Sequence, residues 1–304
     1  MEFKKYQHIE RLNTTATEGI LNGTVVVMPK IDGTNGSLFL GEDGLVHAGS
    51  RKRELDRFKD NQGFYGNFHK DDRIQSYLKK YPTHRLFGEY LKPHSIRTYV
   101  EPAWDKFYVF DVCVDNGDGV KYIPYEEYKP LLEEFGIDYI PVIATLENPS
   151  FDEIAKLLNE NNYLIKENCG YGEGIVIKNY DFINRFGNVV WAKLIHSEFN
   201  NGSKNRGKIK EEDKTKVEKR IARKYITNFV VEKEFSKILN EDPEIQKEKL
   251  IPKLINLVYY TLITEEMWNV VKDFKKPVID LKALLQETRE IIKEAKPELF
   301  TKQQ

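Results

Sequence analysis

The sequence has little of three features that often indicate a protein's class: cysteine, long apolar runs and net charge. Its two cysteines, Cys113 and Cys169, form no CxxC pair and stand near no histidine cluster, which argues against a disulfide framework and a zinc site. The longest apolar run, residues 254–263, is far too short to cross a bilayer, and residues 1–6 are charged rather than apolar. We therefore expect a cytoplasmic protein without membrane association.

The charge balance gives no global sign of a nucleic-acid partner. Lysine and arginine number 47 and aspartate and glutamate 48, a formal net charge of −1. Any phosphate binding must therefore come from a local patch. With 40% hydrophobic and 31% charged residues in 304, the chain has the composition of a folded protein, and its length suggests one ordinary domain plus a smaller one.

The most informative stretch is residues 28–37, Met-Pro-Lys-Ile-Asp-Gly-Thr-Asn-Gly-Ser, between apolar runs at 24–27 and 38–40. The pattern predicts a strand, a tight turn and a second strand. One interpretation is a plain hairpin that needs a positive φ at Gly33, with Lys30 solvated beside it. The other is a lysine nucleophile that attacks a nucleotide α-phosphate and keeps the nucleoside monophosphate. A lysine with a pKa near ~10.4 is almost fully protonated at neutral pH, so the second interpretation requires cations or metal nearby.

The hexapeptide at 30–35, Lys-Ile-Asp-Gly-Thr-Asn, resembles motif I of the covalent nucleotidyltransferases, which include DNA ligases, RNA ligases and mRNA capping enzymes. DNA ligases and capping enzymes usually end this motif in arginine. Asparagine, found here as Asn35, is typical of the nick-sealing RNA ligase 2 family. The resemblance implies that Lys30 takes AMP from ATP and that Asn35 contacts phosphate once the adenylate is transferred.

Three more residues resemble positions of motifs in the same superfamily. Arg51, after a serine, resembles the phosphate-contacting arginine of motif Ia. Glu89, in a Gly-Glu pair, resembles the motif III carboxylate that accepts a hydrogen bond from the ribose, and Phe110 resembles the motif IIIa aromatic that stacks on the purine. Each also has a plainer interpretation: a solvated basic face at 51–53, an internal salt bridge for Glu89, and a core aromatic for Phe110.

Residues 172–178, Gly-Glu-Gly leading an apolar strand that ends in Lys178, resemble motif IV. Its carboxylate serves the divalent metal, so the resemblance implies that Glu173 binds Mg²⁺ or Mn²⁺. The strand at 189–195 resembles motif V, which delivers Lys193 to the α-phosphate. Lys30, Glu173 and Lys193 are therefore the candidate catalytic residues.

Motif V departs from the family pattern at one position. RNA ligases of this type commonly carry a second lysine two positions beyond the first, where this chain has Ile195. Either another basic residue, such as Lys178, Lys204 or Lys208, reaches the phosphates, or charging of Lys30 is slow.

Three expectations concern local structure. We expect a polar entry segment without functional role at 6–13 and a loop at 61–70. The strand at 106–114 is expected to alternate, with Phe107, Val109 and Asp111 on one face and Tyr108, Phe110 and Val112 on the other.

After residue 200 the composition becomes basic and polar and then helical. Helical periodicity predicts helices at 212–222, 235–240, 251–263, 265–274 and 281–295. DNA ligases and capping enzymes typically append an OB-fold barrel, whereas a helical tail resembles that of the RNA ligase 2 family. We expect an α+β fold of antiparallel sheets flanked by helices at 1–205 and a smaller all-helical domain at 206–304.

The motifs together predict an ATP-dependent RNA ligase that joins 3′-hydroxyl and 5′-phosphate ends, with nicked duplex RNA as partner. Recognition of that duplex would rest on phosphates, 2′-hydroxyls and A-form shape. A capping guanylyltransferase and a DNA ligase would share the catalytic residues. A non-enzymatic RNA-binding module is the alternative of a different class.

Overall fold

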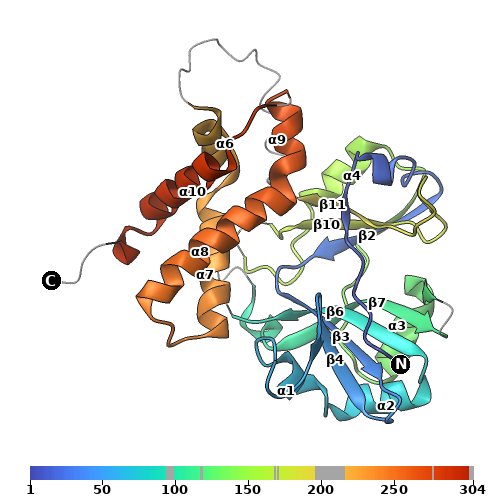
Figure 1. Ribbon diagram of the computed structural model, residues 1–304. Helices are drawn as coiled ribbons and strands as arrows, with labels where there is room; N and C mark the ends of the chain where they lie inside the picture. Colours follow the sequence, from blue (N-terminus) through green and yellow to red (C-terminus); the bar gives the residue numbers. More distant parts are fainter. Residues whose placement is uncertain are drawn as a thin grey trace. The chain divides into compact units, whose positions relative to one another are not determined.

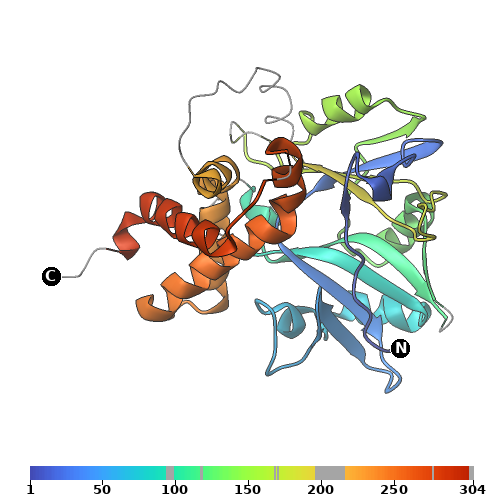
Figure 2. The ribbon, with the colours of Figure 1, turned by 45° about the horizontal axis from the view of Figure 1, so that its top comes forward.

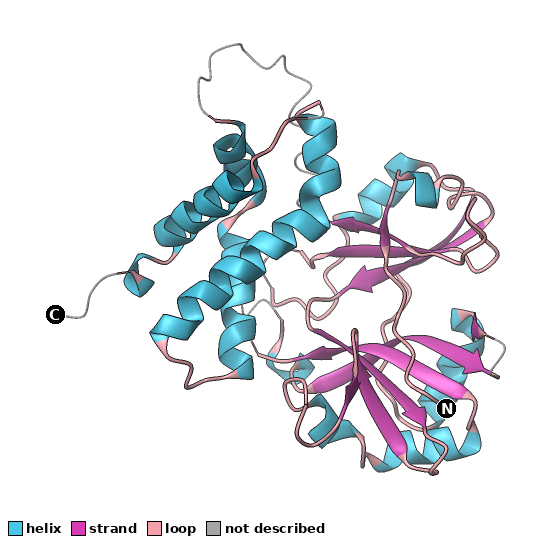
Figure 3. Ribbon diagram, in the orientation of Figure 1, coloured by secondary structure: helices cyan, strands magenta, loops and turns pink. Residues whose placement is uncertain are grey.

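The computed structural model describes residues 1–93, 99–116, 119–167, 169, 171–195, 216–275 and 277–300. The chain separates into two compact units, Met1–Lys92 with Thr98–Gly207, and Pro93–Arg97 with Lys208–Gln304. The first unit holds two antiparallel sheets with flanking helices, and the second holds the C-terminal helices (Figures 1 and 3). This is the predicted α+β fold class. In the described ranges no helix is long and apolar enough to cross a membrane.

Sheet A has five strands in the order β1-β11-β10-β2-β9. Their bounds are β1 Glu10–Arg11, β2 Thr24–Lys30, β9 Ala144–Glu147, β10 Gly174–Lys178 and β11 Ala192–Ile195. Neighbours pair antiparallel, except β1 and β11, which run parallel. Alternate residues such as Val27 and Ile177 share a core with Ile154 of helix α4 (Phe151–Leu158). The residues between them in sequence point to the opposite face, which carries the candidate site.

Sheet B has six antiparallel strands in the order β5-β4-β3-β6-β7-β8. Their bounds are β3 Thr34–Leu40, β4 Val46–Ser50, β5 Glu54–Leu55, β6 His84–Leu91, β7 Lys106–Asp115 and β8 Val120–Tyr122. One face shares a core with helices α1 Phe64–Phe68, α2 Asp72–Lys80 and α3 Tyr125–Glu134. On the other face Phe87 and Cys113 pack with Val176 of sheet A. The two sheets therefore face each other across a buried layer.

The predicted hairpin around Gly33 is wrong, although both of its strands exist. β2 belongs to sheet A and β3 to sheet B, so residues 31–33 carry the chain from one sheet to the other. Gly33 does not adopt a positive φ. A Cβ at Gly33 would instead lie 2.5 Å from the backbone oxygen of Tyr90. The glycine is required by the close approach of this link to β6, not by a turn.

The predicted loop at 61–70 contains the short helix α1. Phe64 is fully buried, and its ring fills the space beside Gly36, where an added Cβ would lie 2.4 Å from the ring. Packing of this aromatic against sheet B overrides the polar local sequence.

The predicted alternation along β7 is also wrong beyond Val109. Asp111 pairs with Phe87, but Val109 pairs with Gly88, so Phe110 is an additional residue at a β-bulge. A bulge reverses the alternation that follows it. Val112 accordingly shares the helix-covered core with Val109, and Asp111 points into the layer between the sheets.

The second unit has its own core, formed by residues such as Ile221, Val231, Leu254 and Ile292. Its helices are α6 Val217–Tyr225, α7 Asn228–Glu241, α8 Lys247–Thr261, α9 Met267–Asp273 and α10 Leu281–Ala295. A π-helical segment, Leu262–Glu266, joins α8 directly to α9. The sequence predicted two separate helices here.

Candidate active site

Lys30 and Glu173 form an ion pair at the edge of the layer between the sheets. Lys30 ends β2 and Glu173 immediately precedes β10, the neighbouring strand. The Nζ of Lys30 lies 2.6 Å from Oε2 of Glu173. The side chains of Lys30 and Glu173 are 22% and 11% exposed, so the pair is largely buried but still accessible to solvent. The antiparallel pairing of β2 with β10 thus brings together Lys30 and Glu173, which lie 143 positions apart in the sequence.

The strand register places Ile195, the position at which motif V departs from the family pattern, beside the Lys30–Glu173 pair. Lys30 pairs with Gly174, and Gly174 pairs with Ile195, so these residues form one row across three strands. A Cβ at Gly174 would lie 2.3 Å from the backbone oxygen of Leu194, so no side chain fits between the other two. Directly opposite residues share a face, so a lysine at position 195 would have flanked Lys30. Lys204 and Lys208, the predicted substitutes from the linker, lie outside the described residues.

Glu89 contacts the link at residues 31–33, which follows Lys30. Its Oε1 accepts a 3.0 Å hydrogen bond from the backbone N–H of Gly33. Burial raises the pKa of Glu89 to about 7, an effect that Lys30 opposes and Asp32 and Glu173 reinforce. The site therefore contains a carboxyl group that titrates near neutral pH, among two further carboxylates and one ammonium.

We expect Glu89 to make folding less favourable as the pH rises. The folded-state pKa of about 7 exceeds the ordinary 4.5, so the folded protein binds this proton more tightly. Stability from this source is fully present below about pH 4.5 and is lost as the pH rises to about 7, by roughly 3 kcal/mol. Glu89→Gln removes the titration and keeps an acceptor for Gly33.

Chemical denaturation of wild type and Glu89→Gln at pH 5 and pH 8 tests this expectation. The variant should gain stability relative to wild type at the higher pH. The exposed Glu42→Gln serves as control and should show no such gain. If the free energies of unfolding of Glu89→Gln and wild type differ by the same amount at both pH values, the account is contradicted.

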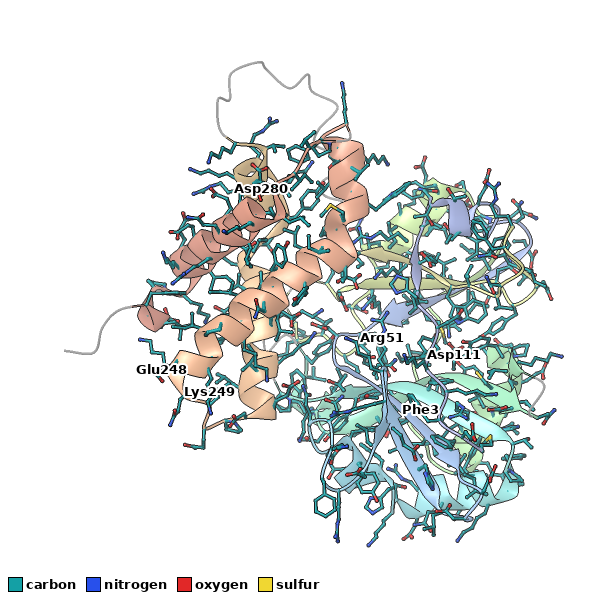
Figure 4. All side chains as sticks on the ribbon, in the orientation of Figure 1. Phe3, Arg51, Asp111, Glu248, Lys249 and Asp280 are labelled. Atoms are coloured by element: carbon teal, nitrogen blue, oxygen red, sulfur yellow. The ribbon has the colours of Figure 1, made fainter. Side chains whose placement is uncertain are left out.

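The other predicted phosphate ligands are distributed around this centre. Asn35 is half-buried and pairs directly with Glu89 across β3 and β6. Lys193 is 7% exposed and pairs with Val176, on the same face of sheet A as Lys30. Arg51 is exposed (Figure 4), and its Nη2 lies 2.8 Å from Nδ1 of His8. The structure thus groups Lys30, Glu173, Glu89 and Asn35.

Phe110 and Lys178 belong to a buried cluster centred on Asp111, which is fully buried. The Nζ of Lys178 donates to Oδ1 of Asp111 at 2.7 Å and to the Phe110 carbonyl at 2.5 Å. The Oδ2 of Asp111 accepts from the Tyr6 hydroxyl at 2.5 Å and from Nε1 of Trp191 at 3.1 Å. Burial lowers the pKa of Lys178, and Asp111 opposes that shift. The ammonium of Lys178 thus already donates two hydrogen bonds within this cluster.

The N-terminal segment, of which residues 6–13 were expected to have no functional role, connects the two sheets. It runs past the strands of both sheets (Figures 1 and 2). Arg85 of β6 donates to the Glu2 carbonyl at 2.5 Å, and Lys4 lies 2.7 Å from Asp115 of β7. Tyr6 reaches Asp111, and β1 then pairs with β11 of sheet A. The partners are more than 80 positions away in sequence, so the local pattern gave no signal of them.

Tyr99 is a further residue beside the candidate site that the sequence did not single out. It is 2% exposed, and its hydroxyl accepts a 2.7 Å hydrogen bond from the backbone N–H of Asp32. Burial and then Asp32 raise the pKa of Tyr99, so the hydroxyl stays neutral. Tyr99 and Glu89 together bind two consecutive N–H groups of the link after Lys30. The link is therefore fixed relative to sheet B.

We expect Tyr99→Phe to slow the chemistry at Lys30 without preventing folding. The variant leaves the Asp32 N–H without this acceptor, which costs about 1–3 kcal/mol. If this cost raises the activation free energy, because the link no longer holds Lys30 in position, the rate falls roughly tenfold. The matched control is Tyr108→Phe, which removes a buried hydroxyl that donates to Ala103. Both variants should lose stability, but only Tyr99→Phe should slow single-turnover lysine modification; equal rates would contradict a positioning role.

Several solved structures with a similar fold are RNA ligases. An apo mutant of the Naegleria gruberi RNA ligase is 20% identical, with a TM-score of 0.50, and the match covers 67% of this chain and 58% of that one. The same ligase with PPi is 18% identical with a TM-score of 0.50, covering 67% and 59%. An archaeal ATP-dependent RNA ligase is 15% identical with a TM-score of 0.50, covering 96% and 74%. A comparison with curated protein sequences finds no match.

The chain shares its fold with these structures. The model of the RNA ligase family matches residues 23–195, more than half of the chain, and this range includes every predicted site residue in the described part. The chain therefore belongs to the RNA ligase family. It spans less than two thirds of the Naegleria ligase chains it matches.

Proposed function

We propose that the protein is an ATP-dependent RNA ligase that works through a lysyl-AMP intermediate on Lys30. The observation that carries the proposal is the Lys30–Glu173 pair, 2.6 Å apart at the edge of the buried layer in a chain of this family. The joined ends would be an RNA 3′-hydroxyl and a 5′-phosphate. The substrate we propose is a nick in duplex RNA.

In the first step the Nζ of Lys30 attacks the α-phosphorus of ATP. A P–N bond forms, the bond from that phosphorus to the oxygen bridging to the β-phosphate breaks, and pyrophosphate leaves. A carboxylate partner favours the ammonium form of lysine, which is not nucleophilic. The pair with Glu173 must therefore open, and the ammonium must lose a proton, before the attack.

The remaining site residues would bind the nucleotide and offset charge. Glu89 would accept from the ribose and Phe110 would stack on the purine. Lys193 and Arg51 would offset negative charge on the phosphoryl oxygens, and Asn35 would contact the phosphate after transfer. We retain Lys178 as a candidate for the missing motif V charge, on the condition that it exchanges Asp111 for phosphate.

Glu173 is the residue we propose to hold Mg²⁺ or Mn²⁺. Its carboxylate supplies the oxygen donor that these ions prefer, and Glu89 and Asp32 add negative charge close by. The described residues include no group of three or more histidine, cysteine, aspartate or glutamate side chains arranged around an ion. A bound ion would offset charge on the phosphates of ATP.

In the later steps AMP passes from Lys30 to the RNA 5′-phosphate, and the 3′-hydroxyl then displaces AMP and seals the strand. Overall, one ATP yields pyrophosphate and AMP, and one new phosphodiester bond is formed. Neither step needs a further oxidant or reductant.

Offering the protein ATP, GTP and NAD⁺, each labelled on the transferred nucleotide, with Mg²⁺ tests the proposal. Covalent label from ATP alone is the expected result, followed by release of the label as AMP when nicked RNA is added. Label from GTP would indicate a capping guanylyltransferase, and sealing of nicked DNA but not RNA would indicate a DNA ligase. Absence of covalent label from all three would leave only a binding module.

A further inference from the structure

The C-terminal unit exposes two aromatic side chains on one face of the helix formed by α8, the π-helical segment and α9. Tyr260 is 59% exposed and Trp268 is 54% exposed. Between them Thr264 is also exposed, and its Oγ1 donates a 2.7 Å hydrogen bond to the Tyr260 carbonyl. This bond places Thr264 on the turn directly above Tyr260. We call Tyr260, Thr264 and Trp268 the aromatic stripe.

The π-helical segment Leu262–Glu266 aligns the stripe. In an uninterrupted α-helix, eight residues would turn Trp268 away from Tyr260 by roughly 80°. A π turn closes between residues i and i+5 and so takes up an additional residue, which brings position 268 back toward the face of position 260. Such segments occur mostly as single turns inside α-helices, frequently at functional sites.

Lysines stand at both ends of the stripe. Lys249, near the start of α8, is exposed (Figure 4), as are Lys272 at the end of α9 and Lys275 just after it. The intervening positions on this face, Asn256 and the stripe itself, carry no charge. Lys253 also falls on this side, but its Nζ is paired with Glu241 at 2.7 Å. The face is therefore uncharged and aromatic in its centre and cationic at its ends.

We propose that the aromatic stripe binds an unpaired strand of RNA that continues from the duplex carrying the nick. Tyr260 and Trp268 would stack on bases, and the flanking lysines would bind phosphates of the same strand. Duplex RNA offers no free base faces for such stacking, because its bases are stacked on one another. The inference rests on the proposed ligase function and adds a substrate feature to it, a single-stranded flank.

The charge pattern favours RNA over a protein occupant. Exposed aromatics between lysines match a chain of alternating bases and phosphates, and eight helical residues span about 12 Å, a distance that a few nucleotides cover. A second copy of this chain would instead bring the same lysines against one another. Dimerisation through the stripe is accordingly a result that would overturn the proposal.

Intrinsic tryptophan fluorescence reports directly on binding at the stripe. Of the three tryptophans, Trp104 is 9% exposed, Trp191 is fully buried and Trp268 is 54% exposed. Titrating the whole protein, without ATP, with a single-stranded RNA oligonucleotide should quench its fluorescence, and a blunt duplex of the same sequence should quench it much less. Equal quenching by both, or none by either, would overturn the proposal.

Affinity measurements on variants supply the second test. Tyr260→Ala and Trp268→Ala should each weaken single-strand binding about tenfold or more, whereas Trp268→Phe should keep most of the affinity. The matched control is Leu281→Ala, which truncates a side chain of the same unit and the same 54% exposure. A loss equal to that of the control, or a change in oligomeric state without loss of RNA affinity, would contradict the assignment.

Lysine charging is measured on the same samples to separate the two proposals. The stripe variants should charge Lys30 from ATP at the wild-type rate, because charging requires no RNA. Failure of wild-type protein to charge would refute the proposed function, whereas normal charging with unaltered RNA affinity in the variants would refute the stripe alone.

Discussion

Replacing Lys30 by alanine is expected to abolish transfer of AMP from ATP to the protein, with no covalent label above background. The reason is chemical: the Nζ of Lys30 is the proposed nucleophile, and the paired Glu173 cannot form the phosphoramidate. The variant should still fold, because the Lys30 side chain is partly exposed and ends a strand whose pairing is made by backbone groups. It should also still seal RNA that already carries a 5′-adenylate, since that step needs no lysyl-AMP.

Lys30→Arg is the control that separates charge from nucleophilicity. The guanidinium keeps the positive charge opposite Glu173 but stays protonated, so it cannot attack phosphorus. We expect this variant to be as inactive in charging as Lys30→Ala. Charging that survives in either variant would show that the nucleophile lies elsewhere, and loss of sealing of adenylylated RNA in both would point to a general structural defect.

Replacing Asp111 by alanine is expected to have the largest effect on stability, about 3–5 kcal/mol. Asp111 and Lys178 are each almost completely buried, and their charges are 2.7 Å apart. Removing the carboxylate leaves the Lys178 ammonium buried without its charged partner, and it also removes an acceptor of Tyr6 and Trp191. Denaturant unfolding of wild type and variant measures the loss.

The double variant Asp111→Leu with Lys178→Met tests the cause. If the loss comes from an unpaired buried charge, removing both charges should restore much of the stability that Asp111→Ala lost. The same double variant bears on the missing motif V lysine: should it still charge at the wild-type rate, Lys178 does not neutralise phosphate. A single Asp111→Ala that unfolds like wild type would contradict the proposed role of the cluster.

The sequence predicted the strands that carry Lys30, Phe110 and Lys193 and the strand that follows Glu173, because each contains an apolar or β-branched run. The range of α10 agrees with the prediction as well. These features depend on neighbouring residues, so a local pattern is sufficient to reveal them.

The features that were wrong or missed depend on contacts distant in sequence. The bulge at Phe110 follows from the pairing of β7 with β6, and one additional residue reverses the faces of everything after it. The role of Gly33 depends on the approach of Tyr90, and that of Tyr6 on Asp111, 105 positions away. Tyr99 acts through a backbone N–H, which leaves no mark on side-chain patterns.

Mapping the modified residue tests the central claim most directly. The protein is incubated with ATP and Mg²⁺, digested under conditions that preserve the P–N bond, and its peptides are sequenced by mass spectrometry. The account predicts one added AMP, on the peptide that contains Lys30 and on the Nζ of that residue. AMP on Lys178 or Lys193, or on no lysine at all while RNA is still sealed from ATP, would contradict it.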